Sequence, residues 1–182
     1  MSDALDFRPF APVLPPARAR ALPWATVIGA SALTAAPVVA TLPLMPPLGL
    51  LMLLTWRLLA RFALRRWAAA PLGLFDDLVS GQPLGSAVLT WSLCFLVIDI
   101  VEQRFGDRDF AQDWLIAAGL IAGVLILGRV VAAPLAAPLA PVLAAQIAAS
   151  VLLFPAFARV VAWIDRRRTQ GQIPGQSPGA PR

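Results

Sequence analysis

Five ionisable side chains lie inside stretches of the chain that are otherwise apolar. They are Arg57, Asp76, Asp77, Asp99 and Arg129. A charge at the centre of a lipid bilayer costs at least about 2.5–3.5 kcal/mol, so each should face protein or water and have a partner. The adjacent Asp76 and Asp77 could bind a proton or another cation, form structural ion pairs, or act together as an acid and a base.

The residue types that usually accompany catalytic carboxylates are scarce in this sequence. There is no histidine, and the single cysteine, Cys94, lies in an apolar run. The absence of histidine excludes a Ser-His-Asp arrangement and a Cys–His zinc site. We therefore expect a protein that is not an enzyme and that has no metal and no cofactor. Cys94 is expected to be a small buried residue.

The composition indicates that most of the chain is embedded in a membrane. Of the 182 residues, 59% are hydrophobic and only 14% are charged. Soluble domains typically have about 45–50% apolar and about 25% charged residues. The formal charge of +5 could suggest nucleic-acid binding, but the arginines lie at the ends of apolar segments. That distribution is typical of membrane topology and argues against a nucleic-acid partner.

Six apolar segments predict an all-α polytopic membrane protein with six transmembrane helices. They cover approximately residues 22–42, 47–64, 66–80, 84–102, 113–133 and 138–163. A span needs about 20 residues, so the third segment is short. We expect its helix to be broken, tilted or shielded by its neighbours. A count of five spans, with the third segment entering and leaving on one side, remains an alternative.

The arginines also predict which side each connection occupies. They lie before the first segment, where the second ends, between the fourth and fifth, and after the sixth. The opposite connections, about 43–46, 81–83 and 134–137, carry no charge. The positive-inside rule then places both termini in the cytoplasm. The predicted organisation is a cytoplasmic tail over 1–20, a six-helix domain over 21–165, and a disordered basic, Gly- and Pro-rich tail over 166–182.

Depth in the bilayer suggests how the buried charges pair. With a rise of about 1.5 Å per residue, Asp76 lies roughly 15 Å above the inner end of its segment, and Arg129 roughly 24 Å above Asp113. We predict that Arg129 pairs with Asp76 or Asp77. Adjacent helical residues point about 100° apart, so one arginine serves both only if the helix breaks.

A second set of pairs is available on the inner side. Asp99 and Glu102 share a helix face, and Arg57 and Arg61 lie near the same end of the second segment. The fifth segment contains GLIAG, residues 119–123, a pattern of small residues that lets helices approach closely. We expect it to serve packing within the protein.

The stretch PLGLFDDLVSGQPLGSAVLTW, residues 71–91, resembles the MreD family of bacterial rod shape-determining proteins. Asp77 matches the acid of the family's helix, and Asp76 fits a double-acid form of it. The other positions that match the family pattern are Gly73, Leu74, Gly81, Pro83, Leu84 and Gly85. The number of spans and the basic tail after the last one are also similar. Two arginines before Trp67 depart from the shorter basic turn that is usual at the start of the third helix.

The resemblance implies a non-catalytic scaffold in the bacterial inner membrane. Its expected partner is MreC, with MreB, RodA and the elongation transpeptidase as indirect partners and lipids around it. The family fold is similar to the six-helix substrate-binding subunits of vitamin transporters, so a small-molecule transporter subunit is an alternative. An ion-coupled carrier that uses Asp76 and Asp77 is a third hypothesis.

Overall fold

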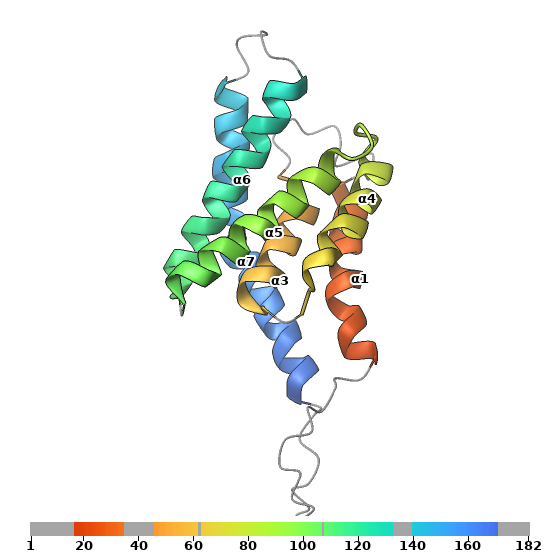
Figure 1. Ribbon diagram of the computed structural model, residues 1–182, viewed down its shortest axis with the longest axis vertical. Helices are drawn as coiled ribbons and strands as arrows, with labels where there is room; N and C mark the ends of the chain where they lie inside the picture. The colour runs from red at the N-terminus through yellow and green to blue at the C-terminus, as the bar shows by residue number, and fades with distance from the viewer. Residues whose placement is uncertain (1–16, 35–45, 62, 107, 133–139, 171–182) are drawn as a thin grey trace, which may run out of the picture.

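The computed structural model describes residues 17–34, 46–61, 63–106, 108–132 and 140–170, and all of the regular structure in them is helical. Figure 1 shows the helices α1 (Ala17–Thr34), α3 (Leu48–Leu59), α4 (Ala69–Ser80), α5 (Ser86–Phe105), α6 (Phe110–Ala132) and α7 (Ala140–Gln170). A 3-10 turn, η1 (Arg66–Ala68), precedes α4. The predicted all-α fold is confirmed.

Three helices of the described residues are long and apolar enough to cross a membrane. These stretches are Ser86–Phe105, Phe110–Val130 and Pro141–Arg167, and they correspond to the predicted fourth, fifth and sixth spans. Two shorter apolar helices cover Ala21–Thr34 and Leu48–Leu59. The predicted first span, 22–42, extends past Thr34 into residues outside the description. The chain is therefore a membrane protein with helices of unequal length.

The predicted second span is shorter in the structure than the sequence suggested, and the third, 66–80, is short as expected, with a 3-10 turn before its α-helix. Helix α3 ends at Leu59, and α4 begins at Ala69; each has 12 residues, or about 18 Å of helix. This is less than the roughly 30 Å thickness of the hydrocarbon core. Helix α4 runs unbroken through Asp76 and Asp77, and the chain turns at Gly81, where φ is 67°. The break lies after the two acids and does not separate them.

Successive helices run in opposite directions, and this brings the arginines together. In Figure 1 the last turns of α3, α5 and α7 point down, as do the first turns of α4 and α6. We call this lower end the arginine side, because Arg57, Arg61, Arg66 and Arg108 lie there. The opposite end contains the turn between α4 and α5 and is called the Asp77 side. This alternation matches the predicted order of the connections.

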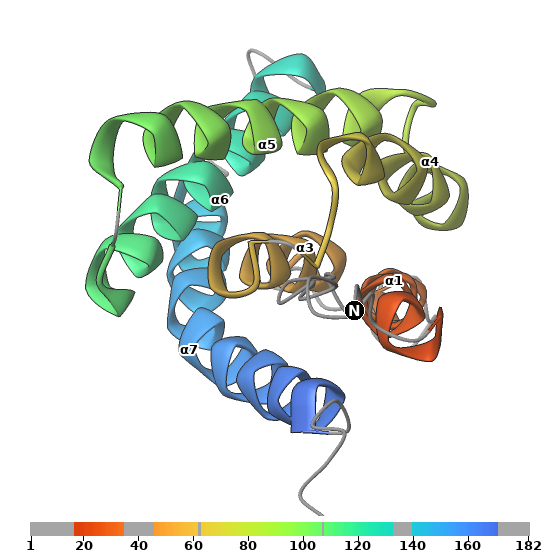
Figure 2. The same ribbon diagram turned by 60° about the horizontal axis from the view of Figure 1, so that its bottom comes forward.

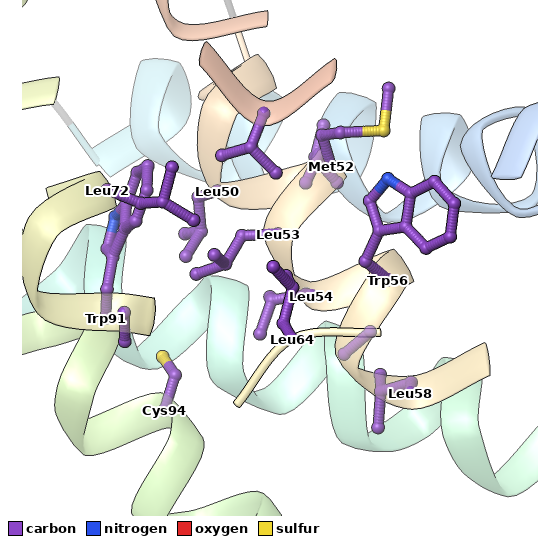
Figure 3. Close-up of a cluster of buried hydrophobic side chains, with 14 of the residues drawn as sticks. Leu50, Met52, Leu53, Leu54, Trp56, Leu58, Leu64, Leu72, Trp91 and Cys94 are labelled. Carbon is purple, nitrogen blue, oxygen red and sulfur yellow. The ribbon is translucent and has the colours of Figure 1, made fainter. Parts of the chain in front are cut away.

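Helix α3 forms the centre of the bundle, as Figure 2 shows. Eleven of its residues are buried, from Leu48 to Leu58. Its leucines pack against Leu72 of α4 and Trp91 and Cys94 of α5 in the cluster drawn in Figure 3. Cys94 is buried, as expected for a small apolar residue. A run that is apolar on every side suits such a central helix, because its whole circumference faces other helices.

The predicted tails overlap the first and last helices. Helix α1 begins at Ala17, inside the predicted tail over 1–20, and α7 continues to Gln170, inside the predicted tail over 166–182. Residues 1–16 and 171–182 lie outside the described residues.

Candidate functional site

The Asp77 carboxylate joins the end of α4 to the start of α5. Its side chain is buried, and its two oxygens accept hydrogen bonds from Gly85 N (2.8 Å), Ser86 Oγ (2.9 Å) and Ala87 N (2.8 Å). The first N–H groups of a helix have no partner within the helix. Gly85 has the N-cap position of α5 but no side chain that could accept a bond. Asp77 therefore caps α5 from the preceding helix.

The glycines of the motif give the backbone the shape that this contact requires. Gly81 and Gly85 both have positive φ, 67° and 96°, which residues with a Cβ rarely adopt. Gly73 lies where α4 touches α5, and a Cβ added there would lie 2.8 Å from backbone atoms of Ala87 and Val88. The structure thus gives a geometric reason for all three motif glycines.

The other motif residues lie at the surface of this junction. Leu74 and Leu84 are exposed, and Pro83 accepts a turn hydrogen bond from Ser86 N (3.1 Å). The exposed apolar side chains of Leu74 and Leu84 suit contact with lipid or another helix. We call the contact of Asp77 with residues 85–87 the Asp77 junction.

Asp76 lies beside Asp77 in the chain but faces a different part of the bundle. A Cβ added at Gly49 of α3 would collide with Ser31 Oγ and lie 3.0 Å from Asp76 Oδ1. Helices α1, α3 and α4 therefore meet where Gly49 lacks a side chain, with the Ser31 hydroxyl and the Asp76 carboxylate beside the gap. Ser31 is buried and Asp76 is half-buried.

The predicted pairing of Arg129 with Asp76 or Asp77 is wrong for the residues that the structure describes. No ion pair joins these residues, and Asp77 is bonded to the start of α5 instead. Helix α4 packs mainly against α5 and α1, whereas α6 packs mainly against α7. The estimate of depth was based on rise along a helix, which says nothing about the lateral position of that helix in the bundle.

The pairs that the sequence made available on the arginine side are formed in the structure. Arg57 of α3 is buried and bonds through Nη2 to Asp99 and to Glu102 Oε2 (2.9 Å), both on α5. Its Nη1 donates to the carbonyl oxygen of Arg61 (3.2 Å). Arg61 Nε also lies 3.8 Å from Glu102 Oε1. The ion pairs hold α3 against the last turns of α5.

Further charges extend this contact to η1 and α6. Arg66 Nε lies 2.9 Å from Asp99 Oδ2, and Arg108 Nη2 lies 3.4 Å from Glu102 Oε1. Arg108 Nε lies 3.2 Å from Asp113 Oδ1, in the first turn of α6. Arg66, Arg108 and Asp113 were not expected as members, although the five-residue spacing of Arg108 and Asp113 across a tight connection could have suggested their pairing. We call these seven residues the arginine cluster: Arg57, Arg61, Arg66, Asp99, Glu102, Arg108 and Asp113.

The two sites join helices through bonds made within the bundle. Asp77 bonds to a helix start, and the acids of the arginine cluster bond to arginines. In the described part of the chain, no three His, Cys, Asp or Glu side chains are placed to hold a metal ion. This chemistry positions helices, and at the start of α5 it supplies the acceptor that backbone N–H groups in a membrane require.

Comparison with known proteins identifies the family. A family model described as rod shape-determining protein MreD matches residues 21–161, which include both sites. No curated protein and no solved structure matches the chain. The chain therefore belongs to the MreD family of rod shape-determining proteins.

Proposed function

We propose that this protein is a non-enzymatic scaffold and regulator of the machinery that builds the lateral cell wall of rod-shaped bacteria. It binds MreC in the inner membrane and acts through MreC with MreB, RodA and the elongation transpeptidase. The family match over residues 21–161 carries the proposal, because it implies a role in determining rod shape.

The arrangement of the charged residues supports a structural role. The carboxylates of Asp77, Asp99 and Glu102 all accept bonds from groups of the same chain. A carboxylate held in this way keeps two helices in a fixed relation. A fixed bundle offers a partner a constant surface, which is what a scaffold requires.

We further propose six crossings of the inner membrane, with both termini in the cytoplasm and the arginine side facing it. The alternation of the helices supports repeated crossings, and the arginines gathered at one end of the bundle support the orientation. Two exposed glutamines provide a matched test, because Gln82 lies on the Asp77 side and Gln103 lies at the end of α5 on the arginine side. In a Cys94→Ala background, Gln82→Cys should react with a membrane-impermeant thiol reagent in whole cells. Gln103→Cys should react only after lysis, and the reverse result would contradict the orientation.

Co-purification and cell shape test the function itself. In cells depleted of their own MreD, the full chain should restore the rod shape. When it is purified from detergent-solubilised membranes, MreC should co-purify with it. Asp77→Ala should reduce MreC recovery or the level of the protein. If cells with the Asp77→Ala variant grow as normal rods and MreC co-purifies fully, the Asp77 junction is not needed for this role. Native mass spectrometry that found a small metabolite and an ATPase-associated partner in place of MreC would support a transporter subunit instead.

A further inference from the structure

The Asp77-side halves of α6 and α7 are less covered than the rest of the bundle. Among the side chains of α6 that the structure describes, the buried ones lie in its first half, namely Asp113, Ala117 and Ile121. The buried side chains in the described part of α7 lie beyond its first two turns, namely Ser150, Phe154, Ala158 and Val161. Figure 1 shows the upper parts of these two helices lying against each other and away from α4 and α1. Their Asp77-side halves therefore have faces that no other described helix covers.

One of these faces runs along α6. Leu115, Gly119, Gly123, Ile126 and Val130 are exposed and recur at the three- and four-residue spacing of a helix face. A Cβ added at Gly119 or Gly123 would have no atom within 4 Å, so these glycines do not serve the internal packing that the sequence suggested. The backbone of α6 is open there to a close neighbour from outside the chain.

Arg129 lies at the edge of this face, three residues after Ile126. The side chain is half-buried, and none of the described residues forms an ion pair or hydrogen bond with it. It lies roughly 24 Å along α6 from Asp113, so it is far from the arginine cluster. A guanidinium in an apolar segment requires an anion, and a carboxylate is its best-matched protein partner.

We propose that this α6 face, consisting of Leu115, Gly119, Gly123, Ile126, Arg129 and Val130, binds a single transmembrane helix that carries an Asp or Glu in its Asp77-side half. The carboxylate accepts hydrogen bonds from Arg129, and the two glycines let the helices approach closely. Lipid phosphate could also neutralise Arg129, but lipid tails do not require a glycine surface on the same side of the helix. The proposal rests on the proposed function in one respect: it takes MreC as the source of that helix.

Photocross-linking in membranes tests the location, with a matched control on another helix. The photoreactive residue benzoylphenylalanine is placed at Ile126 or at Leu93 of α5, in cells that contain MreC. Both side chains are 48% exposed, and each lies about 10 Å along its helix from the end on the Asp77 side. We expect MreC to be cross-linked from Ile126 and to be absent or several-fold weaker from Leu93, because α6 offers an open glycine face and α5 has no glycine.

The charge is tested in the same experiment. Arg129→Glu should lower the yield of the Ile126 cross-link about five- to tenfold, because it places a carboxylate beside the acid of the partner helix. Arg129→Lys keeps a positive charge and should keep most of the yield. Arg129→Gln is a neutral variant in case Arg129→Glu fails to accumulate, and it should give an intermediate loss.

The outcomes separate this inference from the proposed function. If MreC co-purifies but cross-links only from Leu93, the assigned surface is wrong and the scaffold function stands. A cross-link from Ile126 only to lipid, or only to a second copy of this chain, also overturns the assigned occupant. If MreC does not co-purify with the unmodified chain, the proposed function itself fails.

Discussion

Helix α5 has carboxylates at both of its ends, and they are held in different ways. At its start, Asp77 of α4 accepts bonds from two backbone N–H groups and the Ser86 hydroxyl. At its end, Asp99 and Glu102 of α5 itself bond to arginines from three other segments. Both arrangements satisfy a buried acid. They differ in the donors, which are neutral backbone and hydroxyl groups at the start of α5 and charged arginine side chains at its end.

The difference follows from where the arginines lie. The connections predicted to face away from the cytoplasm contain no arginine, so an acid on the Asp77 side has few cations within reach. The unbonded N–H groups at a helix start are then the donors at hand, and the helix dipole favours a negative charge there. Near the arginine side, cations are abundant and acids pair with them. The topology of the chain thus decides which chemistry satisfies a buried carboxylate.

Loss of Arg57 should be the most damaging single change, because it tests the charged end of this comparison. Arg57→Leu leaves Asp99 and Glu102 with fewer partners in a buried setting. Breaking a buried ion pair by removing one member costs about 3–5 kcal/mol. We expect a fall of that size in the free energy of unfolding, measured by SDS titration of the purified protein in detergent, with less protein in the membrane.

Arg66→Ala is the matched control for this change. Arg66 also contacts Asp99, but its side chain is 76% exposed. Exposed pairs contribute about 1 kcal/mol or less. Equal losses of unfolding free energy for Arg57→Leu and Arg66→Ala would show that the burial of Arg57 does not matter. They would contradict the expectation that buried arginines of the cluster stabilise more than exposed ones.

The sequence predicted one end of α5 much better than the other. The pairs among Arg57, Arg61, Asp99 and Glu102 were available from the sequence, because the helical spacing of the acids in the fourth segment and the arginine-rich end of the second segment point to one side. The Asp77 junction was not predicted, since charge complementarity alone does not point to neutral backbone donors.

A signal for the Asp77 junction was nevertheless present. Gly85 begins a helix without a capping side chain, and an acid lies one turn and a short connection before it. Backbone N–H groups inside a membrane need an acceptor, so an uncapped helix start should itself have been treated as a candidate partner. What no spacing could supply was the lateral order of the helices, which places Arg129 away from both acids.

Asp77→Ala should have the second-largest effect, because it tests the neutral end of the comparison. The change removes three bonds to a charged acceptor and leaves two N–H groups of α5 without one. We expect a loss of about 2–3 kcal/mol in the free energy of unfolding, given the usual values for helix caps and for hydrogen bonds to charged groups. SDS titration measures it. Asp77→Asn should cost less, because an amide oxygen still accepts one of the bonds.

Asp76→Ala is the neighbouring control. Asp76 is half-buried and does not bond to α5 in the structure, so its loss should cost less than that of Asp77. A larger effect at Asp76 would place the important contact at Ser31 and Gly49 and would remove the Asp77 junction from its proposed role.

Gly73→Ala tests whether close packing of α4 on α5 positions the Asp77 carboxylate. The new methyl group would lie 2.8 Å from backbone atoms of Ala87, so the two helices must separate. Overpacking of this kind costs about 1–3 kcal/mol. Thermal unfolding in detergent measures the loss. Gly123→Ala on α6 adds the same methyl group where it meets nothing, and it should not destabilise the purified chain.

The smallest expected effect belongs to Gly81, and it isolates the turn from the carboxylate. Gly81 ends α4 with φ of 67° and ψ of 19°, and a Cβ there would meet no other atom. Gly81→Ala therefore tests backbone conformation alone, and a left-handed residue with a side chain costs about 1 kcal/mol. Gly81→Asn should recover part of this, since asparagine tolerates the left-handed region. Thermal unfolding of both variants beside Asp77→Ala would rank the two contributions. If Gly81→Ala costs as much as Asp77→Ala, the turn, and not the bonds to Asp77, fixes the start of α5, and the two ends of that helix differ less than their chemistry suggests.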